Sequence, residues 1–247
     1  MENFNKNVAT IWIPIIGIII GSVLGLILNP SPNVLNYVRM LTMGIVLAAA
    51  ATELLPKVAN VTTTEGRIFV ILGLILSAAL LIGVRLIFGK YTTTFKKSEI
   101  PYDLIVSLGF DFLVTAFLIG ISSNLGGDIT IVLSISLGIQ MFLLTLTLSH
   151  EMQKHNIPHI KIFYIILFIT FIVLIGAILG YYIGKSLRGN PIYYLMLAFG
   201  AASLIWLVTE ELLVFNQEKS NINLTLATSL VFIGFISVIV IRWLTPF

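Results

Sequence analysis

Long apolar segments alternate with short polar links along all 247 residues of the chain. A helix that spans a bilayer needs about 20 mainly apolar residues, and eight segments have or approach this length. These segments are residues 8–28, 37–55, 68–88, 104–121, 129–148, 160–183, 192–215 and 224–244. The links between them carry Gly, Pro and Asn, which are typical of turns. The pattern predicts an all-α polytopic membrane protein with eight transmembrane helices in a single domain, residues 1–247.

The composition agrees with a lipid bilayer as the surroundings of the chain. Hydrophobic residues make up 58% and charged residues 10%, with a mean hydropathy of +1.06, whereas charged residues approach a quarter of a soluble domain. The net charge of +3 is small and its basic residues are scattered, so we expect no nucleic-acid partner. The absence of cysteine excludes disulfides and thiolate metal ligands. We expect no cofactor.

The basic residues favour one orientation in the membrane. With both termini outside, eight Lys or Arg residues fall on the inner side and six on the outer side. Three of the inner ones, Lys90, Lys96 and Lys97, share one link with no acid before Glu99. Because cytoplasmic loops collect Lys and Arg, we expect a multi-pass protein of the cell membrane with both termini extracellular.

Parts of the chain repeat. The GxxxGxxxG pattern of residues 17–25 recurs at 176–184, and the acids that follow agree in spacing, 36 residues from Gly17 to Glu53 and 35 from Gly176 to Glu211. Five crossings separate the two units, so the second enters the membrane from the opposite side. The sequence therefore predicts a 3+2+3 arrangement with inverted three-helix repeats, a plan of secondary transporters whose sites lie near the midplane.

The unrepeated fourth and fifth segments hold a carboxylate at mid-membrane. Ser107, Asp111 and Thr115 lie on one face of the fourth segment, and the fifth segment has a similar stripe of Ser136, Gln140 and Thr147. A charge at this depth costs about 2.5–3.5 kcal/mol on insertion scales and normally meets a partner or a watery path. The stripes predict either a cation site or hydrogen bonds that join the two helices.

Acids also stand near the ends of two corresponding segments. Glu53 lies in the last turn of the second segment, and Glu210 and Glu211 lie near the end of the seventh. The inverted arrangement places these two ends on opposite sides of the membrane. Two interpretations remain open, a pair of cation-attracting vestibules and ordinary acids at a wet interface.

A third cluster follows the fifth segment. His150, Glu151 and His155 suggest the zinc motif HExxH at first sight, but that motif needs histidines four residues apart on one helical face. His150 and His155 are five apart, about 140° from each other around a helix. The cluster is interpreted either as a metal-exit site or as a solvated helix end.

Four stretches resemble one family of membrane proteins, the ZIP (Zrt- and Irt-like) metal transporters. Residues 48–57 (AAAATELLPK), 176–184 (GAILGYYIG) and 205–213 (IWLVTEELL) are similar to its second, sixth and seventh helices. Residues 111–120 (DFLVTAFLIG) have the spacing of its fourth-helix motif HNxPEGxxxG. The resemblance covers nearly the whole chain at low similarity. It implies eight helices in a 3+2+3 arrangement and a divalent metal cation as cargo.

The resemblance also implies a metal site with fewer ligands than the family has. Asp111 takes the place of the family's histidine ligand and Thr115 that of its glutamate. Counting back from the sixth helix puts Gln140 and Met141 on the ligand pair of the fifth, whereas matching letters puts His150 and Glu151 there. With the first alignment the implied metal ligands are Asp111, Thr115, Gln140 and Met141.

We therefore expect a ZIP-like transporter, and not an enzyme, that moves a divalent metal cation such as zinc by alternating access, with Asp111 as the central ligand. The alternative is the same fold carrying another small solute or protons, because most of the family's ligands are missing. A membrane metalloenzyme built on His150 and Glu151 is the remote alternative. A homodimer is considered as the assembly.

Overall fold

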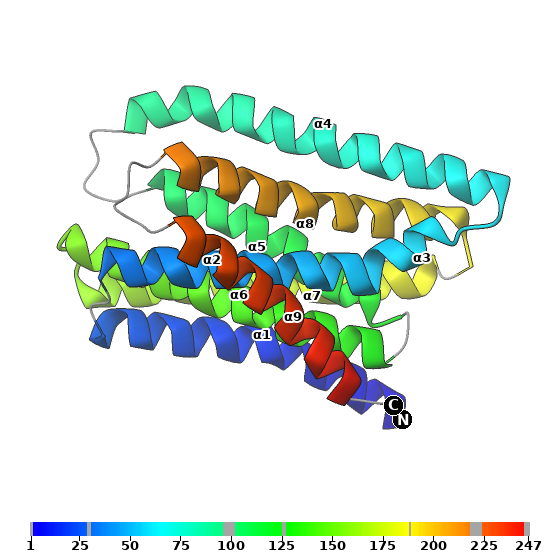
Figure 1. Cartoon of the computed structure of the whole chain (residues 1–247), viewed down its shortest axis with the longest axis horizontal. Helices are drawn as coiled ribbons and strands as arrows, with labels where there is room; N and C mark the ends of the chain where they lie inside the picture. Colours follow the sequence, from blue (N-terminus) through cyan, green and yellow to red (C-terminus); the bar gives the residue numbers. More distant parts are fainter. Residues whose placement is uncertain are drawn as a thin grey trace.

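The computed structural model describes residues 2–28, 31–95, 102–124, 127–187, 189–217 and 224–244. In this part the chain is all α-helical, which confirms the predicted fold class. Figure 1 shows the helices running roughly side by side. In chain order they are α1 (Glu2–Ile27), α2 (Pro32–Ala49), the π-helical turn η1 (Ala50–Leu54), α3 (Leu55–Ala59), α4 (Thr64–Phe95), α5 (Tyr102–Ser122), α6 (Gly127–Lys154), α7 (His159–Ser186), α8 (Pro191–Gln217) and α9 (Leu224–Leu244).

The helices identify a multi-pass membrane protein. Among the described residues, seven helical spans are long and apolar enough to cross a bilayer, and α5 adds a shorter apolar stretch, Leu108–Ser122. The first turn of α1 and the last turn of α9 lie at the same end of the bundle (Figure 1). An even number of crossings requires this arrangement.

Several helices are longer than the apolar segments predicted from the sequence. The largest difference is in α4, which continues to Phe95, so that Lys90 is helical and not part of a link that begins at Gly89. Its 32 residues span about 48 Å at 1.5 Å per residue, more than the hydrocarbon core of about 30 Å. Apolar length therefore marks only the part of each helix inside the hydrocarbon. Lys96 and Lys97 lie outside the described residues.

The second crossing is interrupted by a π-helical turn. It consists of α2, η1 and α3 in direct succession, and the N–H of Leu55 bonds to the carbonyl of Ala50, five residues earlier. Pro56 follows as the second residue of α3. A proline has no N–H to give to the residue four positions before it and crowds that carbonyl, which here belongs to Thr52. The sequence around Pro56 thus explains why the helix widens at this point.

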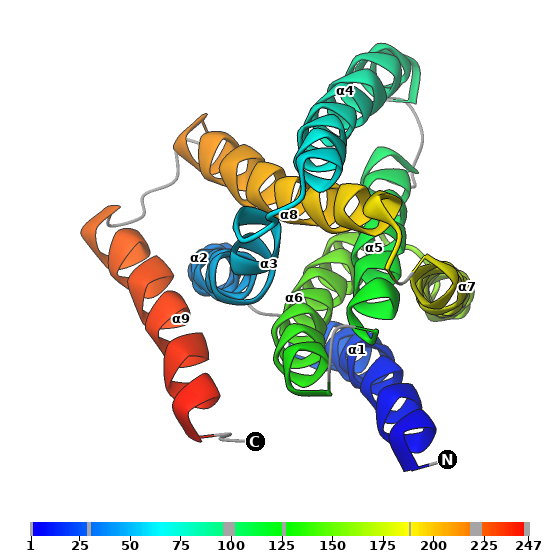
Figure 2. The ribbon, with the colours of Figure 1, turned by 90° about the vertical axis from the view of Figure 1, so that its right-hand side faces the viewer.

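Four helix pairs make the most extensive contacts: α1 with α6, α5 with α7, α2 with α9, and α4 with α8. Figure 2 shows α1, α5, α6 and α7 gathered in one group, with α4 and α9 at the periphery. Helix α6 is central, since 67% of its apolar span is buried against 17% for α9. An apolar cluster formed by residues of α1, α5, α6 and α7, together with Ile157, fills the first group.

The two GxxxGxxxG patterns provide close contacts in two of these pairs, α1 with α6 and α5 with α7. A Cβ added at Gly17 of α1 would stand 2.6 Å from the carbonyl oxygen of Gly138 in α6. One added at Gly176 of α7 would stand 2.9 Å from the carbonyl oxygen of Leu113 in α5. Small residues let helix backbones approach in lipid, where packing replaces the hydrophobic effect as the main attraction.

The helix pairing has the pattern that an inverted repeat requires. Exchanging α1 with α7, α2 with α8, α4 with α9 and α5 with α6 turns each of the four main pairs into another of the four. The contacts of α2 with α6 and of α5 with α8 also exchange. The internal repeat itself stays a prediction.

The close helix contacts predict a sharp difference between two glycines. At Gly180 an added Cβ would collide with the carbonyl of Phe117, whereas at Gly83 it would meet nothing within 4 Å. We expect Gly180→Ala to lower the free energy of unfolding by about 1–3 kcal/mol, the usual cost of overpacking. Gly83→Ala should cause no loss, because alanine is the better helix former. Unfolding of both purified variants in mixed micelles measures this, and equal stability of the two would contradict the packing.

Candidate functional site

The mid-membrane acid bonds to the neighbouring central helix. Gln140 Nε2 of α6 donates to Asp111 Oδ2 of α5 at 3.3 Å. Asp111 lies nine residues after the start of α5 and Gln140 thirteen after the start of α6, so both are near the middle of their helices. The structure thus brings together the carboxylate and the amide that the polar stripes predicted on facing helices.

Two buried oxygens beside this pair have no hydrogen-bond partner. Thr115 Oγ1 lies one helical turn beyond Asp111, and Gln140 Oε1 belongs to the amide that donates to the carboxylate. Both side chains are only 1% exposed. Buried polar atoms normally have partners, and an exception is commonly explained by a bound water or ion. These atoms could serve as oxygen ligands.

Met141 lies in different surroundings. Its side chain is fully buried and belongs to the apolar cluster that also contains Ile15, Ile18 and Phe112. Successive residues of an α-helix project about 100° apart, so Met141 and Gln140 serve different faces of α6. The structure places the predicted thioether in the apolar core, and the polar contact of Asp111 is with Gln140.

The charge at the centre is small for a metal site. Among the described side chains, no three His, Asp or Glu residues gather where they could hold one ion. Asp111, Thr115 and Gln140 supply oxygen atoms and one negative charge. Carboxylate, carbonyl and hydroxyl oxygens suit hard cations better than soft ones.

Glu53 lies in the wall of a cavity at the end of the bundle that carries the termini. The cavity has a volume of about 620 Å³, within the range of small-molecule sites. It is lined by Thr52, Glu53, Pro56, Lys57, Asn60, Val61, Thr62, Thr63, Asn124, Gly189, Tyr193, Tyr194, Leu197 and Arg242. We call it the Glu53 cavity.

The Glu53 carboxylate is buried and paired, unlike an acid at a wet surface. The residue is 4% exposed, and Arg242 Nε of α9 lies 3.5 Å from its Oε1. Thr52 Oγ1 also donates to Oε1, at 3.1 Å. Arg242 Nη1 in turn donates to the Thr52 carbonyl at 3.2 Å, the carbonyl that Pro56 leaves without its helical donor.

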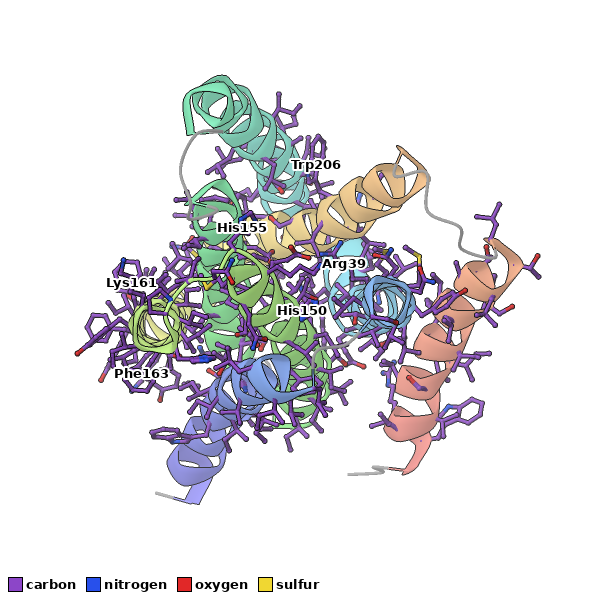
Figure 3. All side chains as sticks on the ribbon, turned by 90° about the vertical axis from the view of Figure 1, so that its left-hand side faces the viewer. Arg39, His150, His155, Lys161, Phe163 and Trp206 are labelled. Carbon is purple, nitrogen blue, oxygen red and sulfur yellow. The ribbon has the colours of Figure 1, made fainter. Side chains whose placement is uncertain are left out.

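The histidines lie at the other end of the bundle and do not form one site. His150 is 6% exposed, with neither ring nitrogen hydrogen-bonded, so it is not part of a solvated helix end. His155 is exposed. Lys154 Nζ forms an ion pair with Glu151 Oε1 at 2.8 Å. Figure 3 shows the labelled His150 and His155 apart from each other at this end of the bundle. The side chains of Glu210 and Glu211 lie outside the described residues.

Sequence reasoning missed the partner of Glu53. Arg242 is 189 residues away along the chain, and only the pairing of α2 with α9 brings the two together. The local signal was Pro56, which follows Thr52 by four residues and predicts a carbonyl in need of another donor. Pro56 indicated that the Thr52 carbonyl needs another hydrogen-bond donor, but it did not identify Arg242 as that donor.

The chain matches no protein-family model, and a search of curated proteins found no significant match.

The Asp111–Gln140 bond predicts a measurable coupling between the two helices. In a double-mutant cycle of Asp111→Ala and Gln140→Ala, we expect a coupling energy between about 0.6 and 1.7 kcal/mol, the mean and the maximum found for interhelical hydrogen bonds in a membrane protein. Unfolding of the four proteins in mixed micelles gives this value. The matched control pairs Asp111→Ala with Ser203→Ala, whose hydroxyl bonds to Ser77 across α4 and α8. Those two changes should add without coupling.

Proposed function

We propose that this protein is a secondary transporter of a small cation, with a divalent metal ion as the first candidate and Asp111 as its central ligand. One observation carries the proposal: a carboxylate in the middle of a membrane-spanning helix bonds to an amide of the most buried helix, next to unpartnered oxygens. Intramembrane acids that face other helices mark ion and proton paths. A purely structural bond would not require the costly ionisable group.

The helix packing supports movement of one group of helices against the other. Asp111 and Gln140 both belong to the group of α1, α5, α6 and α7, whose members are joined by glycine contacts and a shared apolar cluster. The remaining helices pair as α2 with α9 and α4 with α8, and they meet the first group where α2 contacts α6 and α8 contacts α5. Alternating access by an elevator or rocking motion would then carry the site as part of one rigid group.

The cargo follows from two arguments of different kinds. The resemblance of residues 48–57, 111–120, 176–184 and 205–213 to ZIP transporters favours a divalent metal. The donors at the site are oxygens, which favours manganese, magnesium or calcium over softer ions. The orientation with both termini extracellular belongs to the same proposal.

Asp111→Asn tests the role of the carboxylate. The substitution keeps size and hydrogen bonding and removes the charge. A hydrogen bond or contact to a charged ligand is worth about 1.5–3 kcal/mol, so we expect the initial rate of metal uptake into proteoliposomes to fall roughly tenfold or more. Uptake of manganese, zinc, iron and cadmium is measured in parallel.

Glu65→Gln is the matched control, because Glu65 is an exposed carboxylate in the first turn of α4. It should leave uptake unchanged. Equal flux in the wild type and Asp111→Asn would contradict the proposed role, and the absence of flux for every metal would exclude metal transport.

A second candidate is favoured by the single charge at the centre. One carboxylate next to amide and hydroxyl oxygens suits a proton or a monovalent cation, and among the described side chains no three His, Asp or Glu residues gather where they could hold one ion. In this case Asp111 is the group that exchanges the proton.

A flux measurement separates this candidate from the first. If protons are the cargo, proteoliposomes with a trapped pH-sensitive dye should acidify under an inward proton gradient without any metal, and Asp111→Asn should abolish the change. A pH change that requires metal would support coupled metal transport. No pH change in the wild type excludes the proton candidate.

A further inference from the structure

The Glu53 carboxylate presents one oxygen to its protein partners and leaves the other without any. Thr52 and Arg242 both contact Oε1. Among the described residues, Oε2 has no hydrogen-bond or ion-pair partner, and it is not one of the buried side-chain atoms that lack a hydrogen bond. Because Glu53 lines the cavity, a ligand there can reach this carboxylate.

The contact with Arg242 is of a kind that a ligand can replace. The Nε to Oε1 distance of 3.5 Å is longer than the 2.7–2.9 Å of a strong charge-assisted hydrogen bond. The Arg242 side chain is 51% exposed, whereas that of Glu53 is 3% exposed. An arginine at the surface loses little by turning to solvent, but a buried carboxylate must keep a cationic partner. Exchange of one cation for another satisfies both conditions.

We propose that Glu53 is a second cation-binding site, and that Arg242 acts as a tethered competitor that occupies it in the absence of the ion. The ligand class is a small divalent cation held by the carboxylate, with the hydroxyl and amide groups of the cavity wall completing its shell. The choice of a cation rests on the proposed function, but the site is distinct from Asp111. Its ion is released to solvent or onward as Arg242 returns.

The charges of the cavity explain why a competitor has an effect. Arg242 and Lys57 outnumber Glu53 among the charged lining residues, so the resting cavity repels cations. Lys57 is exposed and has no ion pair with any residue that the structure describes. It contributes to the field without contacting the carboxylate. Comparing a substitution of Arg242 with one of Lys57 therefore distinguishes direct competition for the carboxylate from general repulsion of cations.

The expected change in ion affinity follows from the fraction of time that Arg242 occupies the Glu53 carboxylate. If Arg242 occupies the carboxylate about nine-tenths of the time, the apparent affinity for an ion is about tenfold below its intrinsic value. Removing Arg242 should therefore raise the apparent affinity about tenfold. Removing Lys57, which carries the same charge, should change the affinity roughly threefold or less, since exposed charges are screened.

Binding of Mn²⁺ to the purified full-length protein, followed by electron paramagnetic resonance, tests this in an Asp111→Asn background that removes the central site. We expect Arg242→Gln to tighten Mn²⁺ binding about tenfold, Lys57→Gln to have the small effect above, and Glu53→Gln to abolish binding. Similar effects of Arg242→Gln and Lys57→Gln, or weaker binding in Arg242→Gln, would overturn the proposal. So would unchanged binding in Glu53→Gln.

A second measurement leaves Arg242 in place. The chain has no cysteine, so Asn60→Cys in the cavity wall can be labelled specifically with a nitroxide. Mn²⁺ bound at Glu53 should broaden the nitroxide signal, and Glu53→Gln should remove the effect. Absence of broadening overturns the Glu53 site, whatever the outcome at Asp111. A failure of transport in Asp111→Asn proteoliposomes, by contrast, concerns only the central site.

Discussion

The cost of a polar group in hydrocarbon is the constraint on which the rest of this structure depends. Helices meet it for the backbone, because every interior N–H and C=O is bonded within its own segment. Polar side chains inside the membrane avoid this cost by hydrogen-bonding to one another. Ser77 and Ser203 do so between α4 and α8, and Asp111 and Gln140 do so between α5 and α6. The central carboxylate is thus tied to the most buried helix of the bundle.

The GxxxGxxxG patterns of residues 17–25 and 176–184 hold the helices in positions where such hydrogen bonds can form. Where α7 packs on α5 and α1 on α6, the small residues bring backbone against backbone. These contacts fix α5 and α6, the two helices that hold Asp111 and Gln140, from their outer sides. The oxygens of the site can then stay unpartnered within a rigid frame, since the surrounding packing, and not the site itself, supplies the stability.

The sequence predicted the crossings and the polar stripes because both follow from local periodicity. Asp111 and Gln140 were assigned to facing stripes, and the structure joins them. Met141 was proposed from alignment, and its fully buried place in an apolar cluster depends on which face of α6 meets α1. Burial of Glu53 depends on Arg242 from another crossing. Contacts between distant segments cannot be obtained from local pattern.

The two acids described in the interior differ in the kind of partner they have, and this separates their roles. Asp111 accepts a hydrogen bond from the neutral amide of Gln140 on the neighbouring central helix. Glu53 already has the Arg242 guanidinium beside it, so in the proposed exchange the departing arginine offsets part of the charge that a divalent ion brings. Exchange makes Glu53 suited to brief occupancy at one end of the bundle. Asp111 and Gln140 join α5 to α6 in the middle of the bundle, so in the proposed mechanism an ion bound there acts directly on the helices that would move.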